Sequence, residues 1–334
     1  MDLKQLEYYV RVAESGSFSR AAVELDVAQP ALSRQVRLLE TEFRQHLLER
    51  TGRGVVPTEA GRQLLEQSKG LLHQAQRLRD ELGRARGALV GRVVIGMPPS
   101  FSRALAVPLT RAFRERLPDA RLTLSEGLTV TMQAGLVAGR LDIGLLLGVT
   151  PRPEIDLEPL AEDPLVLVYR RRGAIDGVDR AAAGLSGSAC APALPLAELE
   201  ALPLLIPSRP NALRMQIETE LAALGRRPRI ALEVDSVAAI LDLVAEGAGC
   251  AVLSPHALGL APAGAELARR EIGEPLLASR LSLAVSARRP RSDTLAAAAA
   301  VVREVVGGLR APPPGAAADR GTSSPRRAAR KRRS

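Results

Sequence analysis

Residues 17–42, SFSRAAVELDVAQPALSRQVRLLETE, predict two short helices joined by a tight turn. Ser17 is suited to cap the first helix, because its hydroxyl can accept a hydrogen bond from an amide of the first turn. Ala21 and Leu25 then continue an apolar face at helical spacing, and Asp26 interrupts the pattern. We therefore expect the first helix to end at this point.

Pro30 suits the first turn of the second helix, where its missing amide costs no hydrogen bond. The apolar side chains of this helix are expected to face inward: Ala31, Leu32, Val36 and Leu39. The polar ones stay accessible: Gln29, Ser33, Arg34 and Arg37. This pattern indicates a helix-turn-helix whose second helix presents its N-terminal residues to base edges of DNA. The alternative is an ordinary helical hairpin with a solvated face.

The flanking residues favour DNA binding. Residues 2–14 place Leu3, Leu6, Tyr9, Val10 and Ala13 on one stripe, which predicts a third helix and a small core. In residues 47–61, LLERTGRGVVPTEAG, the glycines favour a turn between two short extended segments. Such a hairpin is a wing, and Arg50 and Arg53 are expected at its base and tip, where phosphates can be met.

The charge distribution qualifies this prediction. The formal net charge is +9, but residues 310–334 hold eight basic residues and one acidic residue, and so supply +7 of it. Residues 1–58 hold eight basic and eight acidic residues, which cancel. The prediction of DNA binding therefore rests on where the arginines lie. Glu7, Glu14 and Glu24 are expected to lie away from the duplex.

Residues 58–89 predict a long helix that begins at Thr58. Its apolar stripe comprises Leu64, Leu71, Ala75, Leu78, Leu82, Ala85 and Leu89, with Ser68 filling one position. This spacing is typical of a seam that pairs with a second helix. Pairing fits DNA binding, since two half-sites need two recognition helices at a fixed separation. The alternative is that the stripe packs on its own chain.

From residue 92 strands and helices alternate. The expected strands are 92–97, 121–126, 142–148, 164–170, 203–207, 229–234, 249–253 and 281–286, and the expected helices are 102–116, 130–139, 211–224, 236–246 and 292–308. Residues 173–200 predict an irregular insertion. Alternating elements indicate parallel sheets in an α/β architecture, with a ligand cleft at the carboxyl ends of the strands.

Loops that follow strands and begin helices supply the candidate ligand-binding residues. They are Ser100, Phe101, Ser102, Thr129, Thr131, Ser208 and Arg209. Helix N-termini carry free amides and a partial positive charge, so the ligand is expected to be a small anion. The alternative is that the hydroxyls of Ser100, Thr129 and Ser208 only cap helices.

Motifs of enzymes and metal sites do not occur in the sequence. We find no G-x-G-x-x-G, phosphate loop, H-E-x-x-H or G-x-S-x-G, so we expect neither an enzyme nor a cofactor. The two cysteines, Cys190 and Cys250, lack metal-ligand spacing, and Cys250 is expected in the core rather than in a redox role. His46 and His73 are expected on helix surfaces.

The cellular compartment follows from what the sequence lacks. The N-terminus has no export-signal pattern, and no run of about 18 apolar residues occurs, so we expect a cytoplasmic protein without a membrane partner. Trp is absent and aromatic residues are few, which disfavours a protein that stacks single-stranded bases.

Over roughly residues 1–62 the chain resembles the LysR-type transcriptional regulators. The matching residues are Ala21, Ala22, Leu25, Gln29, Pro30, Ala31, Ser33, Leu39, Glu40, Leu47, Arg50, Thr51, Pro57, Thr58 and Gly61. A weaker resemblance covers 91–309, chiefly EGLTVTMQAGLVAGRLDIGLL and EVDSVAAILDLVAEGAGCAVL. Within the family, the N-terminal run is most similar to the nitrogen assimilation control branch, some members of which need no effector.

The resemblance implies an α/β fold class with four parts: a winged helix-turn-helix at 1–58, a linker and dimerisation helix at 59–90, a two-lobed effector-binding domain like periplasmic solute-binding proteins at 91–309, and a basic tail at 310–334. It also implies that the three ligand loops converge on one cleft. The tail departs from the family, and we expect either a dispensable disordered extension or a non-specific DNA tether.

The resemblance further implies a regulator that acts as a homodimer or tetramer on promoter DNA, under control of a small effector and in contact with RNA polymerase. Pro30, Ser33 and Arg34 are expected to approach bases, while Gln29, Arg37, Arg50 and Arg53 hold the backbone. The alternative function is a cytosolic solute-binding or sensory module without sequence-specific DNA binding.

Overall fold

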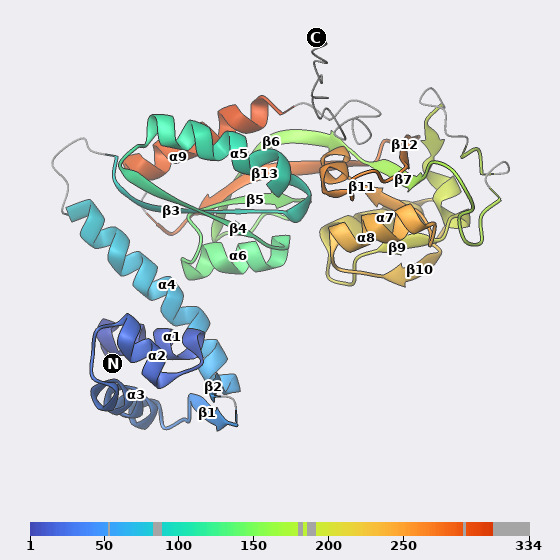
Figure 1. Cartoon of the computed structure of the whole chain (residues 1–334). Coiled ribbons are helices and arrows are strands. Elements are labelled where there is room, and N and C mark those ends of the chain that lie inside the picture. The colour runs from blue at the N-terminus through green and yellow to red at the C-terminus, as the bar shows by residue number, and fades with distance from the viewer. Residues whose placement is uncertain (53, 83–88, 180–182, 186–191, 290–291, 310–334) are drawn as a thin grey trace, which may run out of the picture. The chain divides into compact units, whose positions relative to one another are not determined.

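The computed structural model describes residues 1–52, 54–82, 89–179, 183–185, 192–289 and 292–309 (Figure 1). The chain forms two compact units, each described here by itself. The first comprises Met1–Pro98, Ala106–Leu160 and Ser282–Gly307, and the second comprises Pro99–Leu105 and Ala161–Leu281. Among the described residues, no helix is long and apolar enough to cross a membrane.

The N-terminal part of the first unit is a winged helix-turn-helix. Its elements are α1 (Leu3–Ser15), α2 (Phe18–Glu24), α3 (Gln29–Phe43), β1 (Leu48–Thr51) and β2 (Gly54–Pro57). Ser17 caps α2 by accepting a hydrogen bond from the amide of Arg20, and Pro30 lies in the first turn of α3. The antiparallel pair β1 and β2 forms the wing. The predicted helix pair and hairpin are thus confirmed.

The three helices enclose a small core. Its buried apolar residues are Leu6, Tyr8, Tyr9, Val12, Ala21, Ala22, Leu32, Val36, Leu39 and Leu47. Two predicted core residues are exposed instead: Ala31, and Leu3 with 39% of its surface accessible. Leu3 is the first residue of α1, and Ala31 lies in the first turn of α3, so both project beyond the helix crossing that buries their neighbours.

Helix α4 (Glu59–Leu82) follows the wing, and the last predicted stripe positions, Ala85 among them, lie outside the described residues or beyond the helix. The stripe divides. Leu64 packs against the N-terminal core and Ser68 is fully buried, whereas Leu71 and Leu78 are 45% and 57% exposed. The first half of the stripe therefore packs on its own chain, and the second half remains accessible.

A five-stranded sheet forms the α/β part of the first unit, in the order β4-β3-β5-β13-β6. Its strands are β3 (Gly91–Met97), β4 (Ala120–Glu126), β5 (Ile143–Leu147), β6 (Ile155–Pro164) and β13 (Ala278–Ser286). Helices α5 (Pro99–Arg116) and α9 (Asp293–Gly307) cover one face, and α6 (Thr129–Ala138) covers the other (Figure 1). β3 runs parallel to β4 and β5, as predicted.

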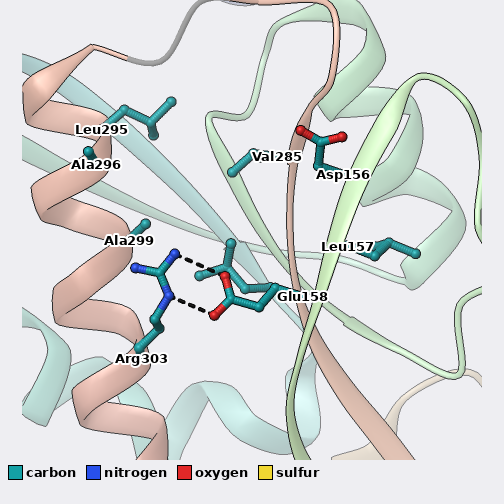
Figure 2. Close-up of a pocket in the computed structure, with 9 residues that line it drawn as sticks. Asp156, Leu157, Glu158, Val285, Leu295, Ala296, Ala299 and Arg303 are labelled. Atoms are coloured by element: carbon teal, nitrogen blue, oxygen red, sulfur yellow. Dashed lines mark hydrogen bonds and ion pairs between the residues drawn. The ribbon is translucent and has the colours of Figure 1, made fainter.

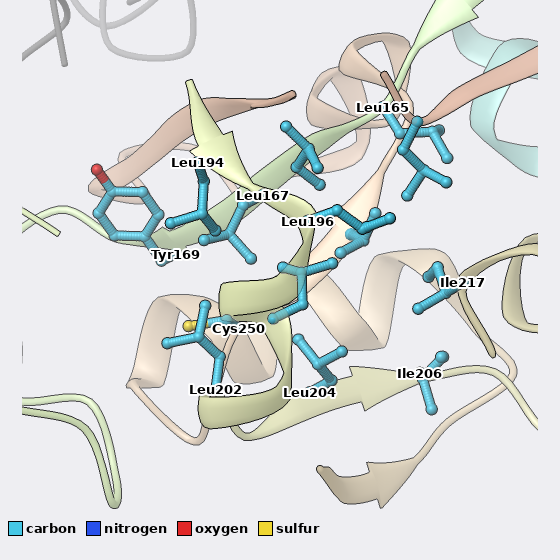
Figure 3. Packing of buried hydrophobic residues seen from close by; sticks show 14 of the residues in the cluster. Leu165, Leu167, Tyr169, Leu194, Leu196, Leu202, Leu204, Ile206, Ile217 and Cys250 are labelled. Atoms are coloured by element: carbon cyan, nitrogen blue, oxygen red, sulfur yellow. The ribbon is translucent and has the colours of Figure 1, made fainter. Parts of the chain in front are cut away.

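The second unit holds a four-stranded sheet, β11-β7-β12-β8, and a two-stranded pair, β10-β9. The strands are β7 (Val166–Arg170), β8 (Leu194–Pro195), β9 (Leu204–Ile206), β10 (Ile230–Glu233), β11 (Ala251–Leu253) and β12 (Leu267–Gly273). The helices are η1 (Leu196–Ala201), α7 (Ala212–Ala223), α8 (Val237–Glu246) and η2 (Pro255–Leu260). The core in Figure 3 joins these layers and buries Cys250 completely, as predicted.

Three expectations for this region were wrong. β7 pairs antiparallel with both β11 and β12, so the sheet is not parallel as predicted. Strands β6 and β12 were not predicted, because charged residues interrupt their apolar pattern (IDLEPLAEDP and LARREIG). The segment 173–200, predicted to be irregular, contains β8 and most of η1 in its described part.

Candidate nucleic-acid interface and ligand site

One side of α3 carries accessible polar residues. Gln29, Pro30, Arg34 and Arg37 are exposed and Ser33 is half-buried. At 100° per residue these positions fall within one arc of the helix, separate from the arc of the buried Leu32, Val36 and Leu39. Within the described part of the chain, no carboxylate forms an ion pair with Arg34 or Arg37. Their charges are therefore available to an external anion.

Acidic residues of this domain are partly engaged elsewhere. Glu24 pairs with Arg11 at 3.4 Å, and Glu14 pairs with Lys69 of α4 at 2.9 Å. Glu40 lies on α3, but its Oε1 accepts hydrogen bonds from the backbone amides of Leu47 and Leu48, at 2.8 and 3.3 Å. These contacts direct three carboxylates to partners within the helix-turn-helix or on α4.

Backbone contacts hold the wing against the helices. The amide of Val55 donates to the carbonyl of Gly16 at 2.9 Å. Gly54 has φ +136°, and a Cβ there would lie 2.4 Å from the Gly16 carbonyl oxygen, so this approach requires glycine. Arg50 is exposed on β1, whereas Arg53 lies outside the described residues. These contacts hold the wing against the turn between α1 and α2.

The start of α4 is anchored on α1. The Tyr9 hydroxyl donates to the carbonyl of Gly61 at 2.6 Å, and a Cβ at Gly61 would lie 2.0 Å from the Leu47 carbonyl oxygen. Burial, followed by the negative charge of Glu40, raises the pKa of Tyr9 to about 12. Thr58 accepts from the amide of Gly61 at 3.0 Å, as expected of a cap. The winged helix-turn-helix (α1–α3, β1 and β2) and α4 are thus packed closely together.

The prediction that His73 lies on the helix surface was wrong. Its side chain is 8% exposed, and its Nε2 lies 2.9 Å from Asp142 Oδ2. That same oxygen accepts from the amide of Val94 at 2.8 Å. His73 is buried because α4 packs on the α6–β5 turn, where Arg140 also pairs with Glu66. His46 is exposed as expected, but it lies in the loop before β1 rather than on a helix.

The predicted ligand residues of the first unit lie at the start of α6. Thr129 is the first residue of the helix, but Leu128 occupies the cap position. The Thr129 hydroxyl donates to the carbonyl of Leu147 at 3.1 Å, across to the end of β5. Thr131 is exposed. The hydroxyl of Thr129 therefore joins two strand-end loops rather than capping α6.

The predicted residues Ser100, Phe101 and Ser102 lie in the first turn of α5, within the second unit. All three are buried, with 9%, 2% and 8% of their surface accessible. The Ser102 hydroxyl donates to the carbonyl of Pro99 at 3.3 Å. Ser100 does not cap the helix, since Pro98 holds that position.

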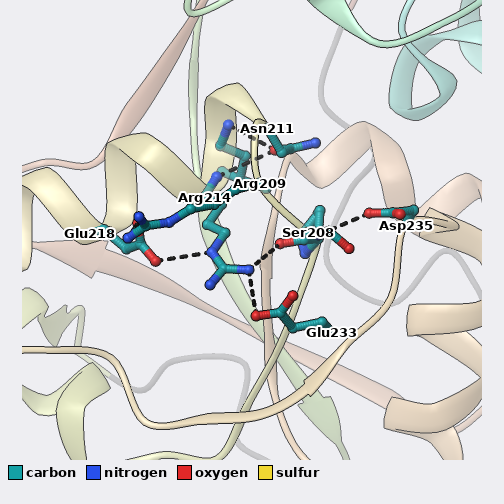
Figure 4. Close-up of polar contacts among 9 residues, drawn as sticks. Ser208, Arg209, Asn211, Arg214, Glu218, Glu233 and Asp235 are labelled. Carbon is teal, nitrogen blue, oxygen red and sulfur yellow. Dashed lines mark hydrogen bonds and ion pairs between the residues drawn. The ribbon is translucent and has the colours of Figure 1, made fainter.

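Ser208 and Arg209 follow β9 in a polar cluster (Figure 4). Asn211, not Ser208, caps α7, and it accepts from the amides of Leu213 and Arg214. The backbone amide of Ser208 donates to Asp235 Oδ1 at 2.8 Å. Arg209, 62% exposed, donates to Glu218 at 2.6 Å. The predicted cation is therefore already paired within the protein.

Arg214 is the residue of this cluster that the sequence did not indicate. Its side chain is 8% exposed and contacts Glu218 at 2.9 Å, Glu233 at 2.8 Å and the carbonyl of Pro207 at 3.1 Å. Burial alone raises the pKa of Glu218, but hydrogen bonds from Arg214 and Arg209 bring it below its usual value. In the sequence, Arg214 has the pattern of an ordinary arginine on a helix surface, so its contacts with Glu233 and Pro207 could not be predicted.

A separate pocket lies in the first unit between β6, β13 and α9 (Figure 2). Leu283, Val285 and Leu295 are among its apolar lining residues. Arg303 and Glu158 at its edge form a two-point ion pair at 2.7 and 2.9 Å. The pocket contains none of the residues predicted to bind a ligand.

Two family models match the chain. Residues 3–62 match "Bacterial regulatory helix-turn-helix protein, lysR family", and residues 86–307 match "LysR substrate binding domain". The chain belongs to the LysR family. It is a DNA-binding transcriptional regulator with an effector-binding domain, not an enzyme. A solute-binding module without DNA binding does not account for the matched helix-turn-helix.

Relatives of this LysR-family regulator are similar to it in sequence or fold over most of the chain. It is 33% identical to the nitrogen assimilation regulatory protein nac of Klebsiella aerogenes, over 86% of this chain and 90% of that protein. The crystal structure of CbnR, a LysR family transcriptional regulator, is 25% identical, with TM-score 0.66 over 92% and 99% of the two chains. Full-length CbnR complexed with its target DNA has the same fold, at 24% identity and TM-score 0.66 over 91% and 100%.

Proposed function

We propose that this regulator binds a partly palindromic promoter site through the exposed side of α3. The observation that carries the proposal is that Arg34 and Arg37 are exposed on that side and have no described carboxylate partner. Pro30, Ser33 and Arg34 approach base edges, and Gln29, Arg37, Arg50 and Arg53 contact the backbone. DNA binding by a chain of this fold is supported by full-length CbnR, which is complexed with its target DNA.

The regulator acts as a homodimer or tetramer in this proposal. Leu71 and Leu78 lie seven residues apart on α4, and they are 45% and 57% exposed. The α4 helix of a second copy of this chain, packed on Leu71 and Leu78, would remove apolar surface from water. It would also hold two winged helix-turn-helix domains together. In this proposal the chain has four functional parts: the DNA-binding domain (1–58), the dimerisation helix (59–90), the effector-binding domain (91–309) and the basic tail (310–334). The regulator acts in the cytoplasm and contacts RNA polymerase.

The effector in this proposal is a small anion that contacts Ser100, Phe101, Ser102, Thr129, Thr131, Ser208 and Arg209. Arg209 is the exposed partner of Glu218, whereas the buried Arg214 also holds that carboxylate. Arg209 can therefore turn to a ligand without leaving Glu218 unpaired. Similarity to nac supports a place in the nitrogen assimilation control branch.

The test is a gel-shift titration with DNA from upstream of the protein's own coding region. The full chain is titrated with and without excess unrelated duplex. We expect a complex that survives the competitor, and loss of that complex in Arg34→Ala. The matched control is Arg111→Ala, which removes another exposed arginine, from α5. If Arg34→Ala and Arg111→Ala bind alike, the proposed reading side is wrong.

Effector control is tested separately with Thr129→Val, which keeps the shape of the side chain and removes its hydroxyl. Small carboxylic acids are screened for a change in the footprint of the wild-type complex. We expect the variant to bind DNA and to lose any such change. A variant that responds as the wild type does would remove Thr129 from the ligand site.

A further inference from the structure

A buried polar cluster in the second unit has no part in the function proposed above. It consists of Asp163 near the end of β6, Ser254 before η2, and His256 in the first turn of η2. Their exposed fractions are 7%, 5% and 8%. Burying such groups costs free energy unless they are paired, so their contacts decide what the cluster does.

The cluster is hydrogen-bonded on one side and open on the other. The Ser254 hydroxyl donates to Asp163 Oδ2 and accepts from the backbone amide of His256 at 3.2 Å. His256 Nε2, however, lies 3.7 Å from Asp163 Oδ1. This separation is longer than a hydrogen bond. A buried acid and a buried imidazole therefore face each other without bonding.

The imidazole also contacts the first turn of α5, to which we assign ligand binding. Its ring centroid lies 4.9 Å from that of Phe101, with 39° between the ring planes. Phe101 is 2% exposed and stands between Ser100 and Ser102 in the first turn of α5. Because protein interiors are close-packed, a shift of the imidazole has to be met by a shift of the Phe101 ring.

The charged groups around His256 and η2 come from three elements, β6, β12 and α5. Burial lowers the pKa of His256, the carboxylate of Asp163 on β6 raises it, and the positive charge of Arg269 on β12 lowers it. Burial raises the pKa of Asp163, while Ser254 and His256 lower it. From α5, Arg103 approaches Gly259 of η2.

Helix α8 contributes apolar side chains to the packing around η2. Ile240, Leu241 and Val244 form one cluster with Ala257. With these surroundings, burial is the largest influence on both groups: it holds the pKa of His256 below its ordinary value and that of Asp163 above its ordinary value. The pair takes up a proton as the pH falls.

We propose that Asp163, Ser254 and His256 form a proton-sensitive device that positions Ser100–Ser102, the residues in the first turn of α5 to which we assign ligand binding. A proton taken up by either group supplies a donor between His256 Nε2 and Asp163 Oδ1, which converts the open 3.7 Å contact into a hydrogen bond and draws the imidazole toward Asp163. Phe101 follows, and the first turn of α5 moves with it. The consequence for effector binding rests on the proposed function, whereas the movement itself does not.

The test uses the absence of tryptophan from the chain. Phe101→Trp places the chain's single tryptophan, whose emission can be excited selectively over that of the three tyrosines, against His256 in the full-length protein. We expect its emission maximum to shift as the pH is lowered from about 8 to about 5. Emission that does not change over this range would overturn the proposal. Circular dichroism at each pH shows that the fold persists.

Two histidine variants, each in the Phe101→Trp background, assign the signal. His256→Asn removes the imidazole of the cluster and should abolish the pH-dependent shift. His46→Asn removes an exposed histidine far along the chain and should leave the shift intact. If the shift persists without His256, another group is responsible and the proposal fails.

A second measurement keeps Phe101 and does not depend on the tryptophan variant. The chain contains three histidines, so selective ¹³C labelling gives three imidazole signals, and His256→Asn identifies one of them. Asp163→Asn should move the midpoint of the His256 signal to lower pH, because it removes the carboxylate that favours the charged imidazole. An unchanged midpoint would contradict the coupling. Specific DNA binding is measured separately in the gel-shift titration, so failure of the proposed function can be told apart from failure of the proton-sensitive device.

Discussion

Arginines on α3 and arginines beside β9 share one side-chain chemistry but differ in their partners. Arg34 and Arg37 are exposed and meet no described carboxylate, whereas Arg209 and Arg214 are both bound to Glu218. Unpaired arginines on an accessible helix suit an external polyanion. Paired arginines at the ends of strands suit structural support and exchange with a small anion. Arginine content alone would not distinguish these sites, since the N-terminal 58 residues carry no net charge.

The largest effect is expected from Arg214→Ala. The substitution leaves Glu218 and Glu233 without their shared buried partner and removes the bond to the Pro207 carbonyl. We expect a loss of about 3 kcal/mol in the free energy of unfolding of the second unit. Urea titration followed by circular dichroism measures it. Arg209→Ala is the matched control, and equal destabilisation by the two variants would refute the distinction between a buried and an exposed arginine.

Arg34→Ala should leave stability unchanged and lower specific DNA affinity. Loss of a two-point contact to guanine corresponds to about 1–3 kcal/mol, or roughly fivefold to 150-fold in affinity. Fluorescence anisotropy on specific and unrelated duplexes provides both affinities. A base-reading role requires a larger loss on the specific duplex, and equal losses on the two duplexes would contradict it.

The ion pairs of the β9 cluster should depend on pH. The folded pKa of Glu218 lies below its usual value, so the unfolded state binds the proton more readily. The stabilisation is present above about pH 4.5 and is lost as the pH falls through the folded pKa. Glu218→Gln should therefore destabilise at pH 7, and its difference from wild type should shrink in acid. A difference that is constant from pH 7 to about pH 3 would show that ionisation of Glu218 is irrelevant.

Arg37→Gln tests a backbone contact. The affinity for all duplexes should fall to a similar extent, and the slope of log affinity against log salt should decrease in magnitude by about one. The titration is repeated at several salt concentrations, with Arg111→Gln as the control. If Arg37→Gln changes sequence preference but not the slope, the residue reads bases instead.

The smallest effect is expected from Arg209→Ala. Because Arg209 is 62% exposed and Glu218 retains Arg214, the free energy of unfolding should change by less than about 0.5 kcal/mol. Thermal unfolding is sufficient to measure it. A loss comparable to that of Arg214→Ala would make Arg209 a structural residue and argue against its turning to a ligand.

Local patterns in the sequence were sufficient to predict the helices of the helix-turn-helix. Ser17, Pro30 and the apolar spacing predicted α2 and α3, because capping and amphipathic burial act over a few residues. The contacts that fix the orientation of the wing could not be predicted from local patterns. Glu40 reaches the amides of Leu47 and Leu48 only because the loop after α3 turns back toward it.

In the effector-binding region the sequence predicted most elements but little of their chemistry. Charged residues hid β6 and β12, and the antiparallel pairing of β7 depends on strands distant in sequence. Thr129 was expected at a helix start, and it lies there, but its hydroxyl bonds to Leu147. Arg214 and His73 appeared to be surface residues, because only the folded chain brings Glu233 and Asp142 to them.

The most direct test of the central claim, that α3 reads bases through Arg34, is a double-substitution cycle between protein and DNA. Each guanine of a half-site is replaced in turn by 7-deazaguanine, which lacks the N7 acceptor, and affinities are measured for wild type and Arg34→Ala. At one position the account predicts that the DNA change weakens the wild type but has no further effect on Arg34→Ala. Additive losses at every position would contradict it.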